Sequence, residues 1–283
     1  MRFLYAWFLP FVLAFIISLV LYALLRDKVY IVDGGGMMPN LSKGEMVLLK
    51  KAEKISKNDI LLIDNPLRRP NQSPKNTLKR CVGLPGDTVE IRSKNLFING
   101  LLQRADFCQF DRKFSFFSTD ELNVAAYRYK IFPAKQSNMT QTVAVPERLF
   151  KRIKSENIVK NISDGVLPED MGDRCLYPFS PHCFWNRDFY GPLVVPKKGL
   201  TIKLSFQTVV YYKFLFEKFE GITVVLKDHK YFVDGQPAET YTFKNDYYFV
   251  LNDYRDDVSD SRTFGPVRRD LILGKYFYSG IFR

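Results

Sequence analysis

The chain has 283 residues, of which 46% are hydrophobic and 15% aromatic, so it can form one large all-β core or two smaller domains. Its formal net charge of +12 favours an anionic partner, either a nucleic acid or a membrane surface. The Lys and Arg residues are dispersed, and no recognition helix, zinc finger or RNA-binding signature accompanies them, so we expect no nucleic-acid partner.

The first segment of the chain is apolar. Phe3 to Leu25 carries no charge and is bounded by Arg2 before it and by Arg26 and Lys28 after it. At about 1.5 Å per residue, a helix of this length crosses a ~30 Å hydrocarbon core. The run is too long for a cleavable signal sequence, and no small-x-small site follows it. We therefore predict one transmembrane anchor over residues 1–28, surrounded by membrane lipids, and the positive residues at both ends leave its orientation open.

Beyond this anchor, short runs of β-branched and apolar residues predict strands. The Asn99-Gly100 pair is typical of a two-residue hairpin turn. The predicted strands up to that turn are Met46–Lys50, Ile60–Asp64, Thr77–Val82, Thr88–Ile91 and Leu96–Ile98.

The segment 105–190 has a different character, because most of it is loop-rich and aromatic. It contains one helical pattern, Pro146–Asn161, with proline at its start and with Leu149 and Ile153 at helical spacing. We interpret this segment as an insertion into a β scaffold.

Strand patterns resume after the insertion. The Asp234-Gly235 pair predicts a second hairpin, which an aromatic strand follows. The predicted strands are Leu200–Leu204, Thr223–Leu226, Tyr231–Val233, Tyr247–Leu251 and Leu271–Phe282. The sequence thus predicts a mostly β core in two parts, 29–104 and 191–283, interrupted by the insertion at 105–190 and carried on the anchor.

The cysteines and histidines do not suggest a metal site. Four cysteines and two histidines occur in the chain, and their spacing fits no zinc-binding pattern, so we predict neither a metal nor another cofactor. A disulfide between Cys175 and Cys183 depends on the redox compartment and stays open. Cys81 lies in an apolar strand, which favours a buried thiol.

A Lys-Arg pair lies inside an apolar strand of the segment Thr77–Ile91, which reads TLKRCVGLPGDTVEI. A lysine on an edge strand with a solvated face is the ordinary interpretation. Lys79, however, is flanked by Leu78 and Cys81, and apolar surroundings lower the pKa of a lysine. Such an amine can act as a general base near neutral pH.

A second polar segment, Leu251–Val267, reads LNDYRDDVSDSRTFGPV and alternates Asp with Arg. A solvated charged loop is again the ordinary interpretation. An aromatic strand delivers this segment and an apolar run follows it, so we expect a loop that internal ion pairs hold in place.

These pieces, in this order, resemble the type I signal peptidase family. That family has an N-terminal anchor, a Ser-Met-x-Pro motif with the nucleophile, a Lys-Arg motif before Gly-x-Pro-Gly-Asp with the general base, and a Gly-Asp-Asn-Arg-Asp-Asn-Ser-x-Asp-Ser-Arg motif. The resemblance implies a domain of coiled β-sheets with an inserted domain, on one transmembrane helix of the bacterial inner membrane, with the bulk of the chain facing the periplasm. It also implies a Ser/Lys dyad that cleaves signal peptides from exported preproteins.

The resemblance places the nucleophile at Gly36, which has no side-chain oxygen, and the general base at Lys79. Arg80 and Asp253 match an ion pair beneath the site of the family. Asp260 and Arg262 match the family motif as well.

Other positions that lie near the reacting atoms in the family depart from its pattern. The serine that bonds the lysine corresponds to Val258, which cannot accept a hydrogen bond through its side chain. The opening glycine of the third motif is the bulkier Asn252, and the next asparagine is Tyr254. The serine that supplies the oxyanion hole in Gram-negative members corresponds to Gly34.

The glycines before Met37 also have two interpretations. They could form a flexible hinge after the anchor, or they could let a peptide backbone approach closely. In the second case the resemblance predicts an apolar peptide-binding groove that involves Met37, Pro39, Leu41 and Leu78. An extended signal peptide or a strand of a partner protein would fit such a groove.

The clustered departures favour a catalytically inactive homologue that acts as a membrane-anchored binding or scaffold subunit of the export and signal-peptide-processing machinery. The alternative is an active signal peptidase in which the serine at position 36 has been replaced. Ser42 is the one hydroxyl that we considered as a substitute nucleophile, and its place beyond Pro39 argues against that role.

Overall fold

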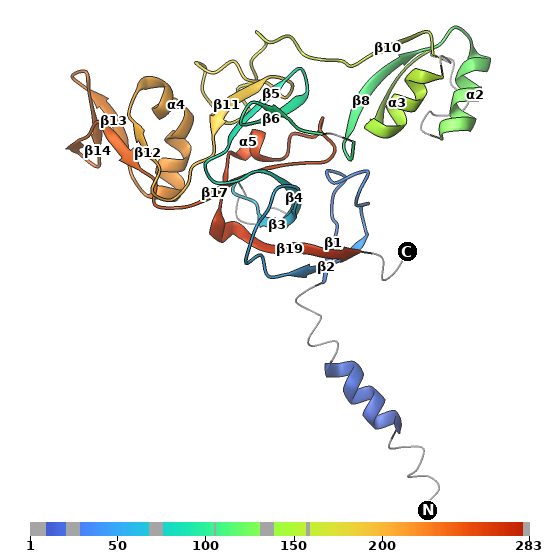
Figure 1. Ribbon diagram of the computed structural model, residues 1–283, viewed down its shortest axis with the longest axis horizontal. Coiled ribbons are helices and arrows are strands. Elements are labelled where there is room, and N and C mark those ends of the chain that lie inside the picture. The colour runs from blue at the N-terminus through green and yellow to red at the C-terminus, as the bar shows by residue number, and fades with distance from the viewer. Residues whose placement is uncertain are drawn as a thin grey trace, which may run out of the picture.

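The structure is a computed structural model that describes residues 10–20, 29–67, 76–104, 106–130, 139–156 and 159–279 (Figure 1). Residues 10–20 are helical. No helix within the described ranges is both long and apolar enough to cross a membrane. The rest of the predicted anchor at 1–28 lies outside the described residues.

The centre of the fold is a sheet of seven strands in the order β1-β2-β19-β3-β4-β17-β18. Its pairs are antiparallel, and the last long strand inserts between β2 and β3, so the two predicted parts of the core form one sheet. The strands are β1 (Val29–Ile31), β2 (Met46–Lys50), β3 (Ile60–Asp64), β4 (Asn76–Gly83), β17 (Tyr247–Leu251), β18 (Val267–Arg268) and β19 (Ile272–Ser279).

A second sheet packs beside it and confirms the first predicted hairpin. Its order is β11-β5-β6-β7, and Asn99 and Gly100 adopt positive φ values of 53° and 77° between β6 and β7. These are the conformations that a tight hairpin turn requires. The strands are β5 (Thr88–Arg92), β6 (Asn95–Ile98), β7 (Leu101–Leu102) and β11 (Tyr190–Val194).

The insertion contains a compact unit with a core of its own. The order of its sheet is β10-β8-β9, and Phe114, Leu122 and Phe150 belong to one buried cluster. The sequence predicted one helix here, but the structure has two. Their bounds and those of the strands are β8 (Gln109–Ser115), α2 (Thr119–Tyr129), β9 (Thr140–Pro146), α3 (Glu147–Ser155) and β10 (Asn161–Ser163).

The two helices of the insertion differ from the prediction in their number and in where they end. Helix α2 begins where the Ser118 side chain accepts a hydrogen bond from the backbone N–H of Glu121, an N-cap signal that an aromatic neighbourhood obscured. Helix α3 ends at Ser155, earlier than predicted, and the chain forms β10 from Asn161. The long segment that follows returns to the core, where Tyr177 is buried among aromatic residues.

The region after β11 also contains a helix that the sequence did not predict. Its elements are β12 (Thr201–Lys203), α4 (Phe206–Leu215), η2 (Phe216–Glu220), β13 (Val224–Lys227), β14 (Lys230–Val233), β15 (Gln236–Pro237) and β16 (Thr240–Thr242). Asp234-Gly235 forms the predicted hairpin turn, which joins β14 to β15. The aromatic strand β17 that follows pairs with β4. Two further short helices, α5 (Ser261–Phe264) and η3 (Arg269–Leu271), lie between β17 and β19.

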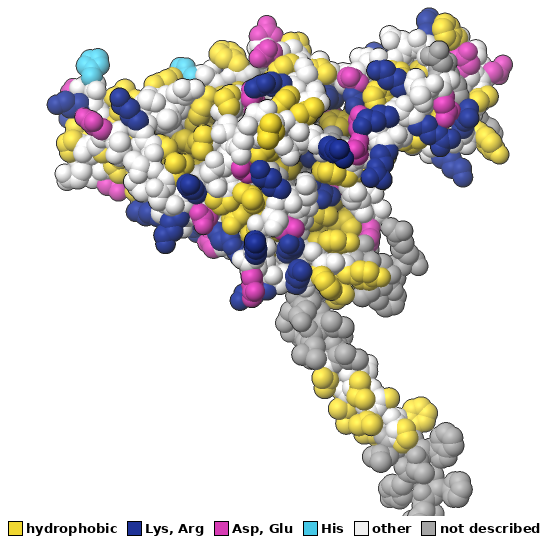
Figure 2. All heavy atoms as spheres, in the orientation of Figure 1, with side chains coloured by type: hydrophobic (Ala, Val, Ile, Leu, Met, Phe, Trp, Pro, Cys, Tyr) yellow, Lys and Arg dark blue, Asp and Glu magenta, His cyan; other side chains and the backbone are white. Residues whose placement is uncertain are grey.

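Two further observations concern the surface and the cysteines. Figure 2 shows Lys and Arg spread over the visible face among Asp and Glu, as the dispersed sequence positions indicated. Cys81 is buried, as predicted, and all four cysteines are free thiols, so Cys175 and Cys183 form no disulfide here.

Candidate functional site

Three segments that are far apart in the sequence meet beside strands β4 and β17 of the central sheet. Strand β4 carries Lys79 and Arg80, and the loop after β17 begins next to it because Leu251 pairs with Arg80. The loop after β1 joins them, since the backbone N–H of Tyr254 donates to the carbonyl oxygen of Gly36 at 2.8 Å. The fold therefore brings together the positions that the resemblance selected.

Lys79 is buried, and its amine donates a hydrogen bond to Oδ1 of Asn252 at 2.6 Å. Burial lowers the pKa of the Lys79 amine below its ordinary value, and the positive charge of Arg262 acts in the same direction. The carboxylates of Asp260 and Asp257 oppose this shift without reversing it. The predicted burial of the lysine and its lowered pKa are thus present, although the groups nearest its amine are polar.

Asn252 is the acceptor that the sequence analysis did not foresee. Its side chain is fully buried, and its Nδ2 donates to the carbonyl of Asp257 at 3.0 Å and to the Ser259 hydroxyl at 3.2 Å. Its backbone N–H donates to Oδ2 of Asp260 at 3.0 Å. These contacts hold the carboxamide in one orientation, with its oxygen toward Lys79. The signal in the sequence was the bulky residue at a glycine position.

Gly36 faces this carboxamide at close range. A Cβ atom at position 36 would lie 2.6 Å from Oδ1 and 2.8 Å from Cγ of Asn252, which is closer than unbonded atoms approach. Gly34 differs, because a Cβ atom there would meet nothing within 4 Å. A side chain at position 36 and the observed Asn252 rotamer therefore exclude each other.

Two buried ion pairs support the site, as the sequence predicted. Arg80 donates from Nε and Nη2 to the two carboxylate oxygens of Asp253, each at 2.6 Å. Arg262 makes the same kind of two-point contact with Asp260, at 3.0 and 2.7 Å. Two parallel charge-assisted bonds fix the geometry of each pair more firmly than one bond would.

Val258 and Tyr254 have roles in the loop that differ from those of their family counterparts. The carbonyl of Val258 accepts from the backbone N–H of Asp260 at 2.7 Å, and Asn252 rather than residue 258 bonds Lys79. The Tyr254 hydroxyl donates to Asp111 of β8 at 2.7 Å. Tyr254 thus ties the site loop to the insertion.

A cavity of about 130 Å³ remains next to the amine. Met37 and Leu78 line it, together with Gly34, Gly36 and Lys79, whereas Pro39 and Leu41 do not. Leu41 packs into the same buried cluster as Met37 and Leu78 without lining the cavity, so the prediction of a groove lined by Leu41 was wrong in this respect.

Three residues that carry hydroxyls, Tyr30, Thr77 and Ser259, line this cavity, while Ser42 lies outside it on an exposed loop. Within the described part of the chain, no group of three or more His, Cys, Asp or Glu side chains is arranged to hold a metal ion.

Comparison with known proteins now decides the family. The model of the signal peptidase family, peptidase S26, matches residues 4–147 and 211–279, which is well over half of the chain. The chain belongs to the signal peptidase family.

This signal peptidase family member also resembles curated bacterial proteins. It is 32% identical over 101 residues to signal peptidase I of Bacillus licheniformis, a match that covers 34% of this chain and 51% of the relative. It is 35% identical over 94 residues to signal peptidase I S of Bacillus subtilis, over 31% of this chain and 47% of the relative. The matched region therefore spans about half the length of these relatives.

Among solved structures, a signal peptidase I of Enterococcus faecalis V583 matches 79% of this chain and 97% of its own at 20% identity, with a TM-score of 0.28. A superposition of that quality adds nothing to the family assignment, which rests on the family model. The mostly β architecture is evident from the strands themselves.

Proposed function

We propose that this signal peptidase family member does not cleave peptides and serves as a membrane-anchored binding or scaffold subunit of the protein-export and signal-peptide-processing machinery. The observation that carries the proposal is the Asn252 carboxamide. It accepts the hydrogen bond of the Lys79 amine and fills the space in which a nucleophile on residue 36 would have to stand.

The chemistry of a Ser/Lys dyad explains why this arrangement is inactive. A neutral amine takes the proton of a serine hydroxyl, and the oxygen attacks the peptide carbonyl. Gly36 offers no oxygen, and the amine of Lys79 instead donates to an amide oxygen that has no proton to give. Loss of a serine nucleophile lowers the rate by roughly 10⁶-fold.

The features retained at the site favour a binding role. The two buried ion pairs keep the loops in place, and the cavity beside Lys79 has an apolar wall of Met37 and Leu78. A residue of a signal peptide or of a partner strand could enter it. The apolar sequence at 1–28 supports an anchor in the bacterial inner membrane, with the folded part in the periplasm beside a partner membrane protein.

The competing hypothesis is an active signal peptidase whose serine has been replaced at position 36. It requires that serine fits there with the remaining residues unchanged. The approach of 2.6 Å between a Cβ atom at position 36 and Oδ1 of Asn252 argues against it, because Asn252 is buried and held on both its oxygen and its nitrogen.

The proposal is tested with the purified full-length chain in phospholipid vesicles and a preprotein whose signal peptide ends in Ala-x-Ala. We expect the preprotein to remain intact while it sediments with the vesicles that carry the chain and not with empty vesicles. Cleavage that the Lys79→Ala substitution abolishes would contradict the proposal. Absence of both cleavage and sedimentation would leave the inactive site and refute signal-peptide binding.

A further inference from the structure

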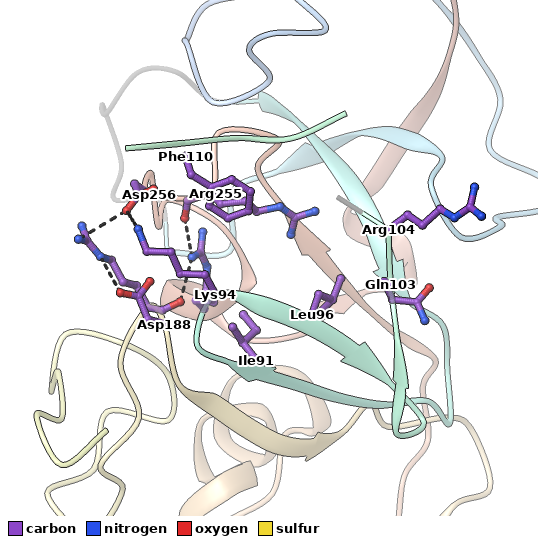
Figure 3. A pocket seen from close by; sticks show the side chains of 11 residues that line it. Ile91, Lys94, Leu96, Gln103, Arg104, Phe110, Asp188, Arg255 and Asp256 are labelled. Atoms are coloured by element: carbon purple, nitrogen blue, oxygen red, sulfur yellow. Dashed lines mark hydrogen bonds and ion pairs between the residues drawn. The ribbon is translucent and has the colours of Figure 1, made fainter. Parts of the chain in front are cut away.

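A groove separates the second sheet from the start of the insertion. Its main chamber measures about 280 Å³, and a smaller chamber continues it, because the two share Leu96, Gln103, Arg104 and Arg255 (Figure 3). We name this feature the junction groove. It lies outside the site described above, which shares no lining residue with the main chamber.

The main chamber is cationic. Its charged lining residues are Lys57, Arg104 and Arg255, and no Asp or Glu lines it among the described residues. Lys57 is neutralised by Asp87 at 3.1 Å. Arg104 is exposed and, within the described ranges, makes no hydrogen bond or ion pair. Its charge helps to lower the pKa of Asp106, and the exposed side chain is available at the rim.

Arg255 supplies the second charge from the site loop. Its Nε donates to Sγ of Cys108 at 3.2 Å, which fixes the guanidinium. Its Nη1 is buried and, in the described part of the chain, has no hydrogen-bond partner. Figure 3 shows this guanidinium pointing toward Arg104, which follows β7. Because Arg255 also lines the main chamber, its positive charge favours an anion bound in the groove.

The remaining wall of the main chamber is mixed, because Asn58 and Gln103 are polar and the other residues are apolar. Leu96, Leu102 and Phe107 line it, and Leu102 is 62% exposed at the rim. Its neighbour Leu101 is 70% exposed on the same hairpin. An exposed leucine, Leu102, beside the cations of the chamber favours a ligand that combines a negative charge with an apolar group, rather than a small inorganic anion.

From these observations we infer that the junction groove binds an acidic, leucine-containing peptide segment of a partner protein. A carboxylate of the segment lies between Arg104 and Arg255, and an adjacent apolar side chain packs against Leu102 and Phe107. Electrostatic complementarity of this kind selects the partner and fixes its register.

The groove is in contact with the candidate site. Phe107 stacks on the guanidinium of Arg80 at 4.4 Å, and Arg80 is paired with Asp253. This inference deepens the scaffold role, but it does not require an inactive site. Peptide binding in the groove can succeed if the chain proves to be a peptidase, and it can fail while the site remains inactive.

The test uses the full-length chain in detergent micelles and a fluorescein-labelled octapeptide of alternating glutamate and leucine, followed by fluorescence anisotropy. We expect saturable binding that Arg104→Gln weakens by about tenfold, the loss typical of one charge-assisted contact. The Leu102→Ser substitution should weaken it severalfold. The control Lys227→Gln removes an exposed lysine far from the groove in the sequence, on β13, and should leave binding unchanged.

Four outcomes would overturn the inference. Equal binding of a lysine–leucine octapeptide would exclude charge recognition, and equal binding of a glutamate–serine octapeptide would reduce the groove to an anion site. Binding that neither Arg104→Gln nor Arg255→Gln alters would place the peptide elsewhere. Binding to anionic phospholipid vesicles that depends on Arg104, with no binding of the acidic peptide, would assign the groove to lipid headgroups instead.

Discussion

Relative to the family motifs, the reacting positions of this protein have changed more than the ion pairs directly beneath them. Beneath the site, Arg80 with Asp253 and Arg262 with Asp260 match the family motifs and make two-point contacts. At the site, the nucleophile position is a glycine and an asparagine occupies the space beside it. The ion pairs are needed to hold the loops in place, whereas a nucleophile at position 36 is needed only for the reaction.

A physical reason for the difference lies in burial. Arg80 and Asp253 are both buried, and removal of one partner leaves an uncompensated charge in the interior. A missing hydroxyl at position 36 leaves no such charge. The fold therefore resists loss of the ion pairs far more than it resists loss of the nucleophile.

The largest expected loss of stability follows from breaking a buried ion pair. Asp253→Ala should lower the free energy of unfolding by about 3–5 kcal/mol, because it leaves the buried Arg80 guanidinium without its partner. Asp270→Ala, which removes the partner of Arg268 at the surface, should cost about 1 kcal/mol or less. Urea unfolding monitored by tryptophan fluorescence compares them, and equal losses would contradict the distinction.

The next largest loss of stability is expected at position 36, which lies against Asn252. Gly36→Ala should destabilise the protein by about 1–3 kcal/mol, since the new Cβ atom overlaps Asn252. Gly34→Ala, which enters open space, should be neutral or stabilise by up to about 1 kcal/mol.

The double substitution Gly36→Ala with Asn252→Gly sharpens the same comparison. Removal of the carboxamide makes room for the methyl group, so the cost of Gly36→Ala should largely disappear in the Asn252→Gly background. A double-mutant cycle of melting temperatures measures the coupling. Additive effects would show that the two positions do not touch.

Lys79 links stability to pH. Its folded pKa lies below the ordinary value of 10.5, so the unfolded chain binds more protons between the two values. The cost of burying this amine is complete below the folded pKa and declines as the pH rises toward 10.5. The advantage in stability of Lys79→Met over the unmodified chain should therefore shrink with rising pH, by at most about 1.4 kcal/mol per pH unit.

Urea titrations from about pH 7 to about pH 10 measure that difference, in which the tyrosines that titrate at high pH cancel. A difference that stays constant over this range would mean that the Lys79 amine is charged in the folded state.

The smallest effect concerns the link between the site loop and the insertion. Tyr254→Phe removes the hydrogen bond to Asp111 and should cost about 1 kcal/mol. Hydrogen exchange should quicken in β8 and in the loop 252–262 while β3 stays protected. Unchanged exchange in both segments would mean that the hydroxyl does not couple them.

Much of the core and of the site could be predicted from the sequence. Strands β2 and β3 have the predicted bounds, and Lys79, Arg80 and Asp253 meet as the motifs indicated. The order of the strands in the central sheet could not be predicted, because β19 inserts between β2 and β3, which are distant from it in sequence.

Two of the helices, α2 and α4, and the lysine partner could not be predicted either. Helices α2 and α4 begin at serine N-caps within aromatic stretches, where short-range patterns are ambiguous. The orientation of the Asn252 amide depends on Asp257 and Ser259, and no one-dimensional pattern shows that the three meet.

The central claim, that the Asn252 carboxamide stands in place of the nucleophile, is tested most directly by reversing the substitutions. Cleavage of a preprotein is measured for Gly36→Ser alone and for Gly36→Ser combined with Asn252→Gly and Val258→Ser. We expect no cleavage with the single substitution and Lys79-dependent cleavage with the combination. Full cleavage by Gly36→Ser alone would contradict the claim, because serine would then fit beside Asn252 and reach the amine.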